Sequence, residues 1–490
     1  MKQTFNPFLP LDVYIPDGEP HIFGNRIYLF GSHEEAGGET YCTLDYEFFS
    51  ASIDDLSNWT SKGINYRASQ DPLYCKERPY MYAPDVVQGN DGKYYLYYCL
   101  SGYQGKGGYH GPISVAVCDT PDGKYEYLGV VKYENGTTFN KFVCFDPAVM
   151  NDNGVIRLYY GTALPFGIYL SKAAKWILAS SYKRFYGKTR KEICTNPSVW
   201  GANMLTLCDD MLTVKTDAVR IISEKAKGTD FEGHAFFEGS SIRKINDIYY
   251  FIYSSQLNHE LCYATSKFPD RDFKFGGTIV SAGDVGLNGR KESDSLNIIG
   301  TTHGSIECVG GQWYVFYHRL THNSNYSRQA CAEPIKIKAD GSIEQIEISS
   351  CGLNNKPLIA KGKYPAVIAC NITNGSMPKI SNRKYDKPIP MIKQKDNENF
   401  ISGIDNKTTV SYKWFDFESS NGKISLDIDS GANGKIHIFA NDNEIAKAEI
   451  NQFGRRIVET EYSINDKSKQ TVAIRFTGNG KLDLYEIEFK

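Results

Sequence analysis

Five segments of the chain repeat one pattern, in which Gly, Asn or Asp turn residues lead into an alternating, aromatic-rich run. They are HIFGNRIYLFGSH (21–33), DVVQGNDGKYYLYYC (85–99), PAVMNDNGVIRLYYG (147–161), SIRKINDIYYFIYSS (241–255) and SIECVGGQWYVFYHR (305–319). Turn residues followed by alternation of this kind predict a β-hairpin whose second strand is the aromatic-rich run. A chain that repeats one hairpin five times is constrained to a repeat architecture.

The spacing of the repeats indicates which architecture this is. Equivalent positions in the second strands are separated by 67, 62, 93 and 64 residues, and they are Tyr28, Tyr95, Arg157, Tyr250 and Tyr314. A unit of about 60–70 residues suits a four-stranded propeller blade with long loops. The long third interval implies an insertion near 170–230, where SKAAKWILAS predicts a short helix and DMLTVKTDAVRIIS predicts strands. We therefore predict an all-β protein with a five-bladed β-propeller over residues 1–350.

An ionisable residue stands at the start of the first strand of every repeat, 10 to 12 positions before the residues compared above. The five are Asp17, Asp85, Asp146, Glu238 and His303. The innermost strands of a propeller surround one central channel, so equivalent strand starts meet at one mouth. An Asp before Pro or Gly is by itself a common turn signal. Five ionisable groups in register instead predict a shared pit, where crowding drives carboxyl pKa values apart as acid–base catalysis requires.

At these residues the chain resembles glycoside hydrolase family 43, whose members are five-bladed propellers. The resemblance covers about residues 10–350 and is carried, in the family's order, by YIPDGEPHIFGNRIYLFGS, MYAPDVVQGNDGKYYLYY, FDPAVMNDNG, FFEGSSIRKINDIYYFIYSS and GTTHGSIECVGGQWYVFYHR. It implies that Asp17 is the general base, Glu238 the general acid, and Asp146 the residue that orients Glu238 and raises its pKa. Inversion requires the base and acid to lie about 6.5–9.5 Å apart, with water between the base and the sugar.

The match at the base is incomplete. The family often has Asp-Pro there, whereas here Gly18 follows Asp17. Asp12 and Glu19 are rival candidates for the base, but the register with the other repeats favours Asp17.

The resemblance also implies roles for residues around the three carboxylates. His303 matches a blade-five histidine near the pit floor that holds the site or a calcium or sodium ion, and a buried core histidine is an equal alternative. Arg328 matches an arginine that contacts the sugar at subsite −1, although it could also brace a blade. Tyr82 stands where relatives carry an aromatic residue facing the substrate. Asp85 is interpreted as structural, capping its strand and closing blade two.

The C-terminal part of the chain loses the repeat. We interpret residues 351–364 as a linker and 365–490, where short strands recur about every 10 residues, as an antiparallel, jelly-roll-like β-sandwich. This part resembles family 6 carbohydrate-binding modules. Tyr412, Trp414 and Phe415 could form a platform for sugars, but of the neighbours Trp414 and Phe415 at least one must point into the core. A structural role beside the propeller is the favoured alternative, and a calcium ion in acidic loops stays open.

Composition excludes several classes of protein. The 55 Lys and Arg nearly balance the 57 Asp and Glu, so no general positive field favours nucleic acid. No run reaches about 18 consecutive apolar residues, so we expect no membrane partner. The first 20 residues lack the apolar core of a signal peptide, which predicts a cytoplasmic protein unless such a peptide was removed. The 12 cysteines are scattered singly, which argues against zinc sites and a disulfide framework.

The resemblance therefore predicts an inverting glycoside hydrolase that releases terminal α-L-arabinofuranose or β-D-xylose from plant cell-wall oligosaccharides. No cofactor is expected for the chemistry, with a structural Ca²⁺ left open, and the oligomeric state is not predicted. An exo-galactosidase or arabinanase stays open, because loops such as 101–112 and 162–237 set the subsites. A non-catalytic sugar-binding propeller gains nothing from crowding three carboxylates. The opening NDPNG string of the retaining invertase-like families is absent.

Overall fold

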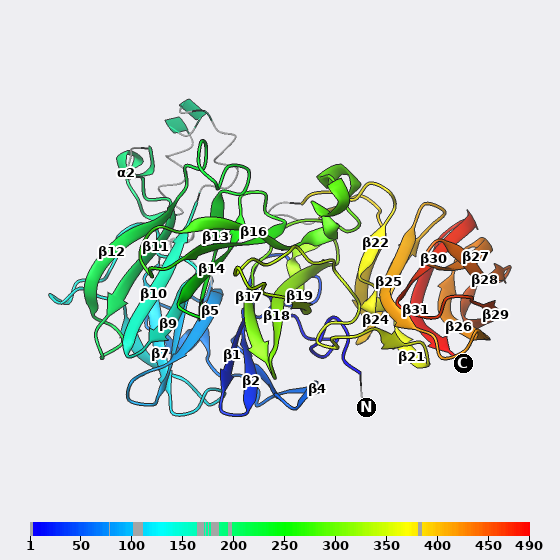
Figure 1. Cartoon of the computed structure of the whole chain (residues 1–490), viewed down its shortest axis with the longest axis horizontal. Helices are drawn as coiled ribbons and strands as arrows, with labels where there is room; N and C mark the ends of the chain where they lie inside the picture. Colours follow the sequence, from blue (N-terminus) through cyan, green and yellow to red (C-terminus); the bar gives the residue numbers. More distant parts are fainter. Residues whose placement is uncertain are drawn as a thin grey trace.

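The computed structural model describes residues 3–77, 79–100, 111–163, 171, 173–174, 176–177, 186–194, 198–380 and 385–490. It has two all-β parts, a five-bladed propeller formed by the N-terminal two thirds of the chain and a β-sandwich formed by the rest (Figure 1). The predicted fold class is confirmed. Half of the predicted SKAAKWILAS helix and most of the 101–112 loop lie outside the described residues. Within the described ranges no helix is long and apolar enough to span a membrane.

Each of the first four blades is a four-stranded antiparallel sheet in chain order. Blade one is β1 (Glu19–Phe23), β2 (Arg26–Phe30), β3 (Phe49–Ser52) and β4 (Asp55–Ser61); blade two is β5 (Met81–Gln88), β6 (Tyr94–Leu100), β7 (Ile113–Cys118) and β8 (Glu126–Val130); blade three is β9 (Ala148–Asp152), β10 (Val155–Thr162), β11 (Gly201–Leu207) and β12 (Val214–Ser223); blade four is β13 (Phe236–Ile245), β14 (Ile248–Ser255), β15 (Glu260–Ser266) and β16 (Lys274–Ser281). The helix α2 (Arg190–Cys194) lies in the insertion of blade three, and short 3₁₀ turns occur at Ala68–Gln70, Ala282–Asp284, Leu287–Gly289, Glu292–Asp294 and Ala366–Ile368.

Blade five has three strands, β17 (Ser305–Val309), β18 (Gln312–Thr321) and β19 (Ser324–Ile335). The N-terminal segment lies along the free edge of β19, where the Asn6 side chain donates to the Ala332 carbonyl at 3.0 Å and accepts from the Ala332 amide at 3.0 Å. The Asn6 side chain thus satisfies backbone groups that a fourth strand would otherwise pair. The five aromatic-rich runs of the sequence are the second strands β2, β6, β10, β14 and β18, as the repeat predicts.

The ring is closed by apolar packing between its first and last blades. One buried cluster combines Ile27, Leu29 and Phe49 of blade one with Tyr314 and Phe316 of blade five. Because side chains of a strand alternate between its two faces, every blade can bury residues against both of its neighbours. The five inner strands are therefore held around one axis, which brings their starts together.

The sandwich consists of two sheets whose described strands number six each. One sheet contains β20 (Leu358–Ile359), β22 (Asn371–Thr373), β25 (Thr409–Asp416), β27 (Asn433–Ala440), β28 (Asn443–Ile450) and β30 (Gln470–Asn479); the other contains β21 (Gly362–Pro365), β23 (Met391–Lys395), β24 (Glu398–Ile404), β26 (Asn421–Ser430), β29 (Gly454–Ser463) and β31 (Leu482–Phe489).

The predicted linker 351–364 is wrong in part, since it contains β20 and most of β21. Leu358 and Tyr364 are buried in the sandwich core, so these apolar side chains draw the stretch into the two sheets. The proposed aromatic platform is also not formed. Tyr412 and Phe415 are buried in the same core, and Trp414 is covered by the Lys469 ammonium group 4.8 Å from its ring centre.

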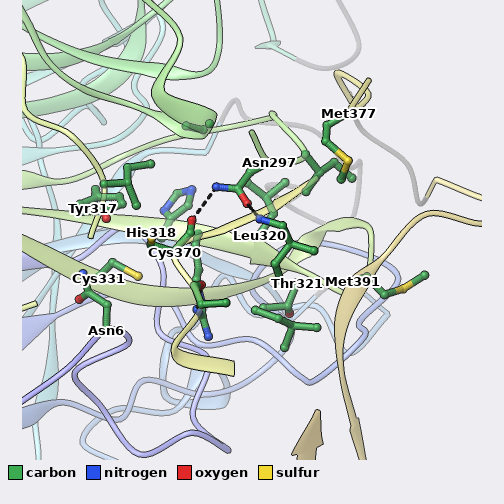
Figure 2. Close-up of a pocket in the computed structure, with 18 of the residues that line it drawn as sticks. Asn6, Asn297, Tyr317, His318, Leu320, Thr321, Cys331, Cys370, Met377 and Met391 are labelled. Carbon is green, nitrogen blue, oxygen red and sulfur yellow. Dashed lines mark hydrogen bonds between the residues drawn. The ribbon is translucent and has the colours of Figure 1, made fainter. Parts of the chain in front are cut away.

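Buried polar groups join the sandwich to the propeller. The Lys413 ammonium lies 2.9 Å from a carboxylate oxygen of Asp284 and 2.7 Å from one of Glu347. Lys413 is 5% and Asp284 2% exposed, so the Lys413–Asp284 pair is almost dry, whereas Glu347 is partly exposed. Beside it, blade five and the sandwich enclose a cavity of about 60 Å³, with room for a few water molecules. Figure 2 shows its lining, including His318 from the propeller and Met391 from the sandwich.

We predict that Lys413→Met lowers the free energy of unfolding by about 3 kcal/mol, because removing one partner of a buried ion pair leaves a dry charge behind. The measurement is urea unfolding followed by fluorescence. Lys363→Met is the matched control, because Lys363 and Glu486 form an exposed pair at 2.8 Å, whose loss costs about 1 kcal/mol or less. Equal small losses in both variants would contradict the prediction.

Candidate active site

The five ionisable residues predicted at the strand starts occur in two structural settings. Asp17, Asp146 and His303 each stand two residues before the inner strand of their blade, whereas Glu238 and Asp85 lie inside β13 and β5. The pairing of both strands shifts register beside these residues. Such bulges re-aim a side chain within a strand. The carboxylates are thereby presented at the channel mouth even where the strand begins earlier.

Asp17 and Asp146 have left-handed backbones, with φ of 58° and 45°. Asp tolerates this conformation better than most residues, because its short polar side chain can bond locally. A left-handed residue just before the inner strand reverses the side-chain direction there. Strained backbones of this kind concentrate at functional sites.

Arg328 of β19 holds Asp17 through two hydrogen bonds. Its Nη1 donates to Asp17 Oδ1 at 2.8 Å and its Nη2 to Oδ2 at 3.3 Å, and the side chains of both residues are buried. Burial raises the pKa of Asp17, but the Arg328 charge, with smaller contributions from His303 and His318, outweighs it and lowers the pKa to about 2. Asp17 is therefore ionised at neutral pH.

Glu34 is the second anion on the same arginine. Arg328 Nη2 donates to Glu34 Oε1 at 2.7 Å, and the Arg328 backbone N–H donates to Oε2 at 3.0 Å. Burial lowers the pKa of Arg328, but the two carboxylates raise it well above its ordinary value. Tyr41 lies over the guanidinium, whose carbon is 5.0 Å from the ring centre. The predicted direct contact of Arg328 with sugar stays a prediction, and the structure shows a buried arginine shared between two carboxylates.

Two histidines of blade five face Asp17. His318 Nε2 lies 2.9 Å from the Thr301 carbonyl and must donate to it, which leaves Nδ1 as the acceptor for the Asp17 backbone N–H at 3.4 Å. Burial and the Arg328 charge lower the pKa of His318 to about 3, so it is neutral at working pH. His303 Nδ1 lies 3.8 Å from Asp17 Oδ1. Burial also lowers the pKa of His303.

Asp146 and Glu238 are a coupled pair on neighbouring blades. The Gly239 N–H donates to Asp146 Oδ2 at 3.0 Å, which ties Asp146 to the residue next to Glu238. Burial and the Asp17 charge raise the pKa of Glu238 to about 8. Burial and the Glu238 charge also raise the pKa of Asp146. Both shifts favour the protonated carboxyl forms, so at neutral pH the pair holds at least one proton.

Below the pit, Asp85 joins three blades. Its Oδ1 lies 2.6 Å from His21 Nε2, and its Oδ2 accepts the Val149 N–H at 2.7 Å. Asp85 lies inside β5 and not at its start, and its structural role stays a prediction that these contacts support. Of the rival bases, Asp12 is exposed, and Glu19 lies in the channel 3.3 Å from the Arg243 guanidinium. Neither rival shares the setting of Asp17.

The channel also contains donors that could hold a cation. Ligand atoms of Glu19, His21 and Asp85 lie within 4.8 Å of one another. Within the part of the chain that the structure describes, buried His303 Nε2 and Glu19 Oε1 have no hydrogen-bond partner. Their lack of partners fits a bound ion, because buried polar atoms are almost always paired.

Tyr82 is 8% exposed, and its ring centre lies 5.7 Å from that of Phe145, the residue before Asp146. It therefore forms part of the wall behind Asp146, and its contact with substrate stays a prediction.

Sequence reasoning missed Glu34 and His318. His318 lies inside β18 and Glu34 follows β2, and Arg328, the arginine that Glu34 pairs with, lies 294 positions away in the sequence.

Arg328→Met should destabilise the fold more at pH 7 than at pH 3. Because the pKa of Asp17 is lower in the folded than in the unfolded protein, ionised Asp17 stabilises the fold at pH values above its unfolded-state pKa. This stabilisation is lost as the pH falls toward 2, the folded-state pKa. Without Arg328, two buried carboxylates lose their cation, which costs about 3 kcal/mol at pH 7. Unfolding measured at both pH values tests this, with exposed Arg455→Met as control. An equal loss at both values would refute the role of the charge.

A family model described as glycosyl hydrolases family 43 matches residues 6–189 and 185–343. A xylosidase/arabinosidase from Thermoclostridium stercorarium is 42% identical over 430 residues, which cover 85% of this chain and 83% of that protein. Xylosidase/arabinosidase 43A from Humicola insolens is 25% identical over 350 residues, covering 68% of this chain and 96% of that protein.

Solved structures share the fold. A family 43 enzyme from Xanthomonas citri, in complex with xylotriose, has a TM-score of 0.53 at 24% identity and covers 70% of this chain and 93% of its own. An exo-β-1,3-galactanase from Phanerochaete chrysosporium covers 100% of this chain and 98% of its own, with a TM-score of 0.51 at 12% identity. The likeness of the C-terminal sandwich to family 6 modules stays a prediction, since the family match ends at residue 343. On the family match and the 42% identity, this chain belongs to glycoside hydrolase family 43.

Proposed function

We propose that this glycoside hydrolase releases terminal pentose, β-D-xylose or α-L-arabinofuranose, from short plant cell-wall oligosaccharides by single-step inversion. The observation that carries the mechanism is the opposite shift of two carboxyl groups in one pit. The pKa of Asp17 falls to about 2, while that of Glu238 rises to about 8. At neutral pH one is ready to accept a proton and the other to donate one.

In this mechanism the Asp17 carboxylate takes a proton from a water molecule, whose oxygen attacks the anomeric carbon. The Glu238 carboxylic acid donates its proton to the glycosidic oxygen, the bond to the leaving group breaks, and the configuration at the anomeric carbon inverts. The reaction ends with Asp17 protonated and Glu238 ionised, so one proton must return to Glu238 through solvent before the next turnover.

Asp146 is assigned as the residue that orients Glu238 and keeps it protonated. The Gly239 N–H donates to Asp146, which favours the ionised form of Asp146 over that of Glu238. When only one of the two groups is protonated, the proton is therefore assigned to Glu238. Ionised Asp146 then opposes the loss of that proton by like-charge repulsion.

The pentose preference is supported by the relatives. The proteins from T. stercorarium and H. insolens are both xylosidase/arabinosidases, and a further relative from Xylanibacter ruminicola, 25% identical, is a β-xylosidase. The oligosaccharide partner and the cytoplasmic location stay predictions. A screen of p-nitrophenyl xyloside, arabinofuranoside and galactoside tests the sugar class, and turnover of the galactoside alone would overturn the pentose assignment.

The acid and base roles predict different responses to the leaving group. Glu238→Gln should lower kcat on p-nitrophenyl xyloside by about 10²–10⁴-fold, the usual contribution of a general acid. The loss should shrink strongly on a dinitrophenyl xyloside, whose leaving group needs no proton. Asp17→Asn should lose activity on both substrates, because water activation is still required.

Exposed Glu232→Gln, six residues before Glu238, is the control and should retain wild-type rates. Equal losses of Glu238→Gln on the two leaving groups would refute its role as the acid.

We also propose that a calcium-type cation binds in the channel with His303 as one ligand, alongside oxygen ligands of the kind that Ca²⁺ prefers. The unpaired buried Nε2 of His303 supports this. Added Ca²⁺ should raise the unfolding temperature of EDTA-treated enzyme, and His303→Gln should abolish the rise. An unchanged unfolding temperature of the wild type would contradict the proposal.

A further inference from the structure

The hairpin turn between β18 and β19 is fastened to the sandwich. Its two residues, His322 and Asn323, have left-handed backbones with φ of 56° and 51°. The His322 N–H donates to the Ile392 carbonyl at 2.9 Å, and the Gln394 N–H donates to His322 Nε2 at 3.0 Å. The Tyr385 N–H donates to the Asn323 carbonyl at 2.9 Å. Figure 2 labels two residues next to this seam, Thr321 at the end of β18 and Met391 at the start of β23.

These bonds define the tautomer of His322. Because Nε2 accepts from Gln394, the ring proton of neutral His322 lies on Nδ1. Nδ1 is 2.9 Å from the Thr321 hydroxyl and 3.1 Å from the Ser327 hydroxyl. The Ser327 oxygen also accepts the N–H of Gly37 at 2.9 Å. His322 and Ser327 thus connect a strand of the sandwich to the connection between β2 and β3 of blade one.

The blade-one connection fits closely against this hairpin. A Cβ added to Gly37 would lie 3.2 Å from the His322 ring, and one added to Gly38 would lie 2.8 Å from the Tyr326 carbonyl oxygen. The Ser324 hydroxyl also donates to the Gly38 carbonyl at 3.3 Å. A wider residue at either glycine would push the connection away from the hairpin.

The same connection forms the wall around Arg328. Tyr41 packs edge-on against Tyr326 with ring centres 4.6 Å apart, and it also covers the Arg328 guanidinium. The Cys42 N–H donates to Glu34 Oε1 at 3.4 Å. Arg328 directly follows Ser327 in β19. Arg328 is therefore the chain neighbour of Ser327, which bonds through His322 to the sandwich.

We propose that His322 is a positioning residue through which strand β23 of the sandwich holds Ser327, the 35–42 connection and Arg328 in the geometry that orients Asp17. The inference rests on the proposed function of Asp17. It makes the sandwich a part of the catalytic unit, acting through the hairpin without contacting substrate.

His322→Asn tests the inference, because Asn tolerates the left-handed turn but is too short to replace both ring nitrogens. We expect kcat/KM on p-nitrophenyl xyloside to fall about tenfold, within the loss of up to 10²-fold that small misplacements cause. We also expect the acidic limb of the pH profile of kcat/KM to move upward, because a loosened Arg328 depresses the pKa of Asp17 less. A merely structural role would lower the amount of folded enzyme without moving this limb.

A variant on the sandwich side tests whether the positioning of Arg328 depends on the sandwich. Gln394→Pro removes the N–H that bonds to His322 while keeping the position in β23, an edge strand where proline is best tolerated. It should move the acidic limb in the same direction. The double variant His322→Asn with Gln394→Pro should move it no further than His322→Asn alone, because His322→Asn already breaks the bond that Gln394→Pro removes. Fully additive shifts would show that the two residues act separately and would overturn the proposal.

His437→Asn is the matched control, since His437 lies in β27 on the side of the sandwich away from the propeller (Figure 1) and bonds only locally to Glu444 and Thr477 among the contacts that the structure shows. It should leave the pH profile unchanged.

Should His322→Asn fail to fold, Ser327→Ala takes its place with the same expected shift. A wild type inactive on every pentoside would overturn the proposed function. An active wild type whose folded His322→Asn and Ser327→Ala variants keep both rate and acidic limb would overturn this inference alone.

Discussion

The sharing of Arg328 between Asp17 and Glu34 is the interaction on which the rest of the site depends. A single buried carboxylate would be protonated by desolvation, and a single buried cation would be costly to keep charged. With the carboxylates of Asp17 and Glu34 on one guanidinium, Arg328 stays charged. Asp17 can then stay ionised although Asp146 and Glu238 lie in the same pit. Its charge then helps to keep the pKa of Glu238 high. The asymmetry between base and acid thus begins at an arginine that is 3% exposed.

The propeller makes this arrangement possible, because it brings residues far apart in sequence to one axis. Asp17 comes from the start of blade one and Arg328 from the last strand of blade five, 311 positions later. These two blades share one apolar cluster, so the packing that closes the ring also brings Arg328 next to Asp17. The sandwich adds to this closure, since it bonds to the hairpin that precedes Arg328 and shares the buried Lys413–Asp284 pair with the propeller.

Much of this architecture could be predicted from local chemistry. Turn residues before aromatic runs located all five second strands, because hairpin turns have strong backbone preferences. The register of the repeats also brought Asp17, Asp146, Glu238 and His303 to one mouth. Glu34 and His318 were missed, because their importance arises from pairing across the ring closure and leaves no local signal. The interpretation of 351–364 as a linker is wrong in part, because β20 and β21 are too short for alternation to be visible in the sequence. Tyr412 and Phe415 are core residues, which follows from packing between sheets.

The central claim is that water, activated by Asp17, displaces the leaving group in one step while Glu238 protonates it. Proton NMR of the reaction on an aryl β-xyloside, recorded before mutarotation equilibrates the product, tests this most directly. The account predicts that α-xylose appears first and the β-anomer grows in later. First appearance of β-xylose would mean retention through a covalent intermediate, and would contradict the assignment of Asp17 as a base.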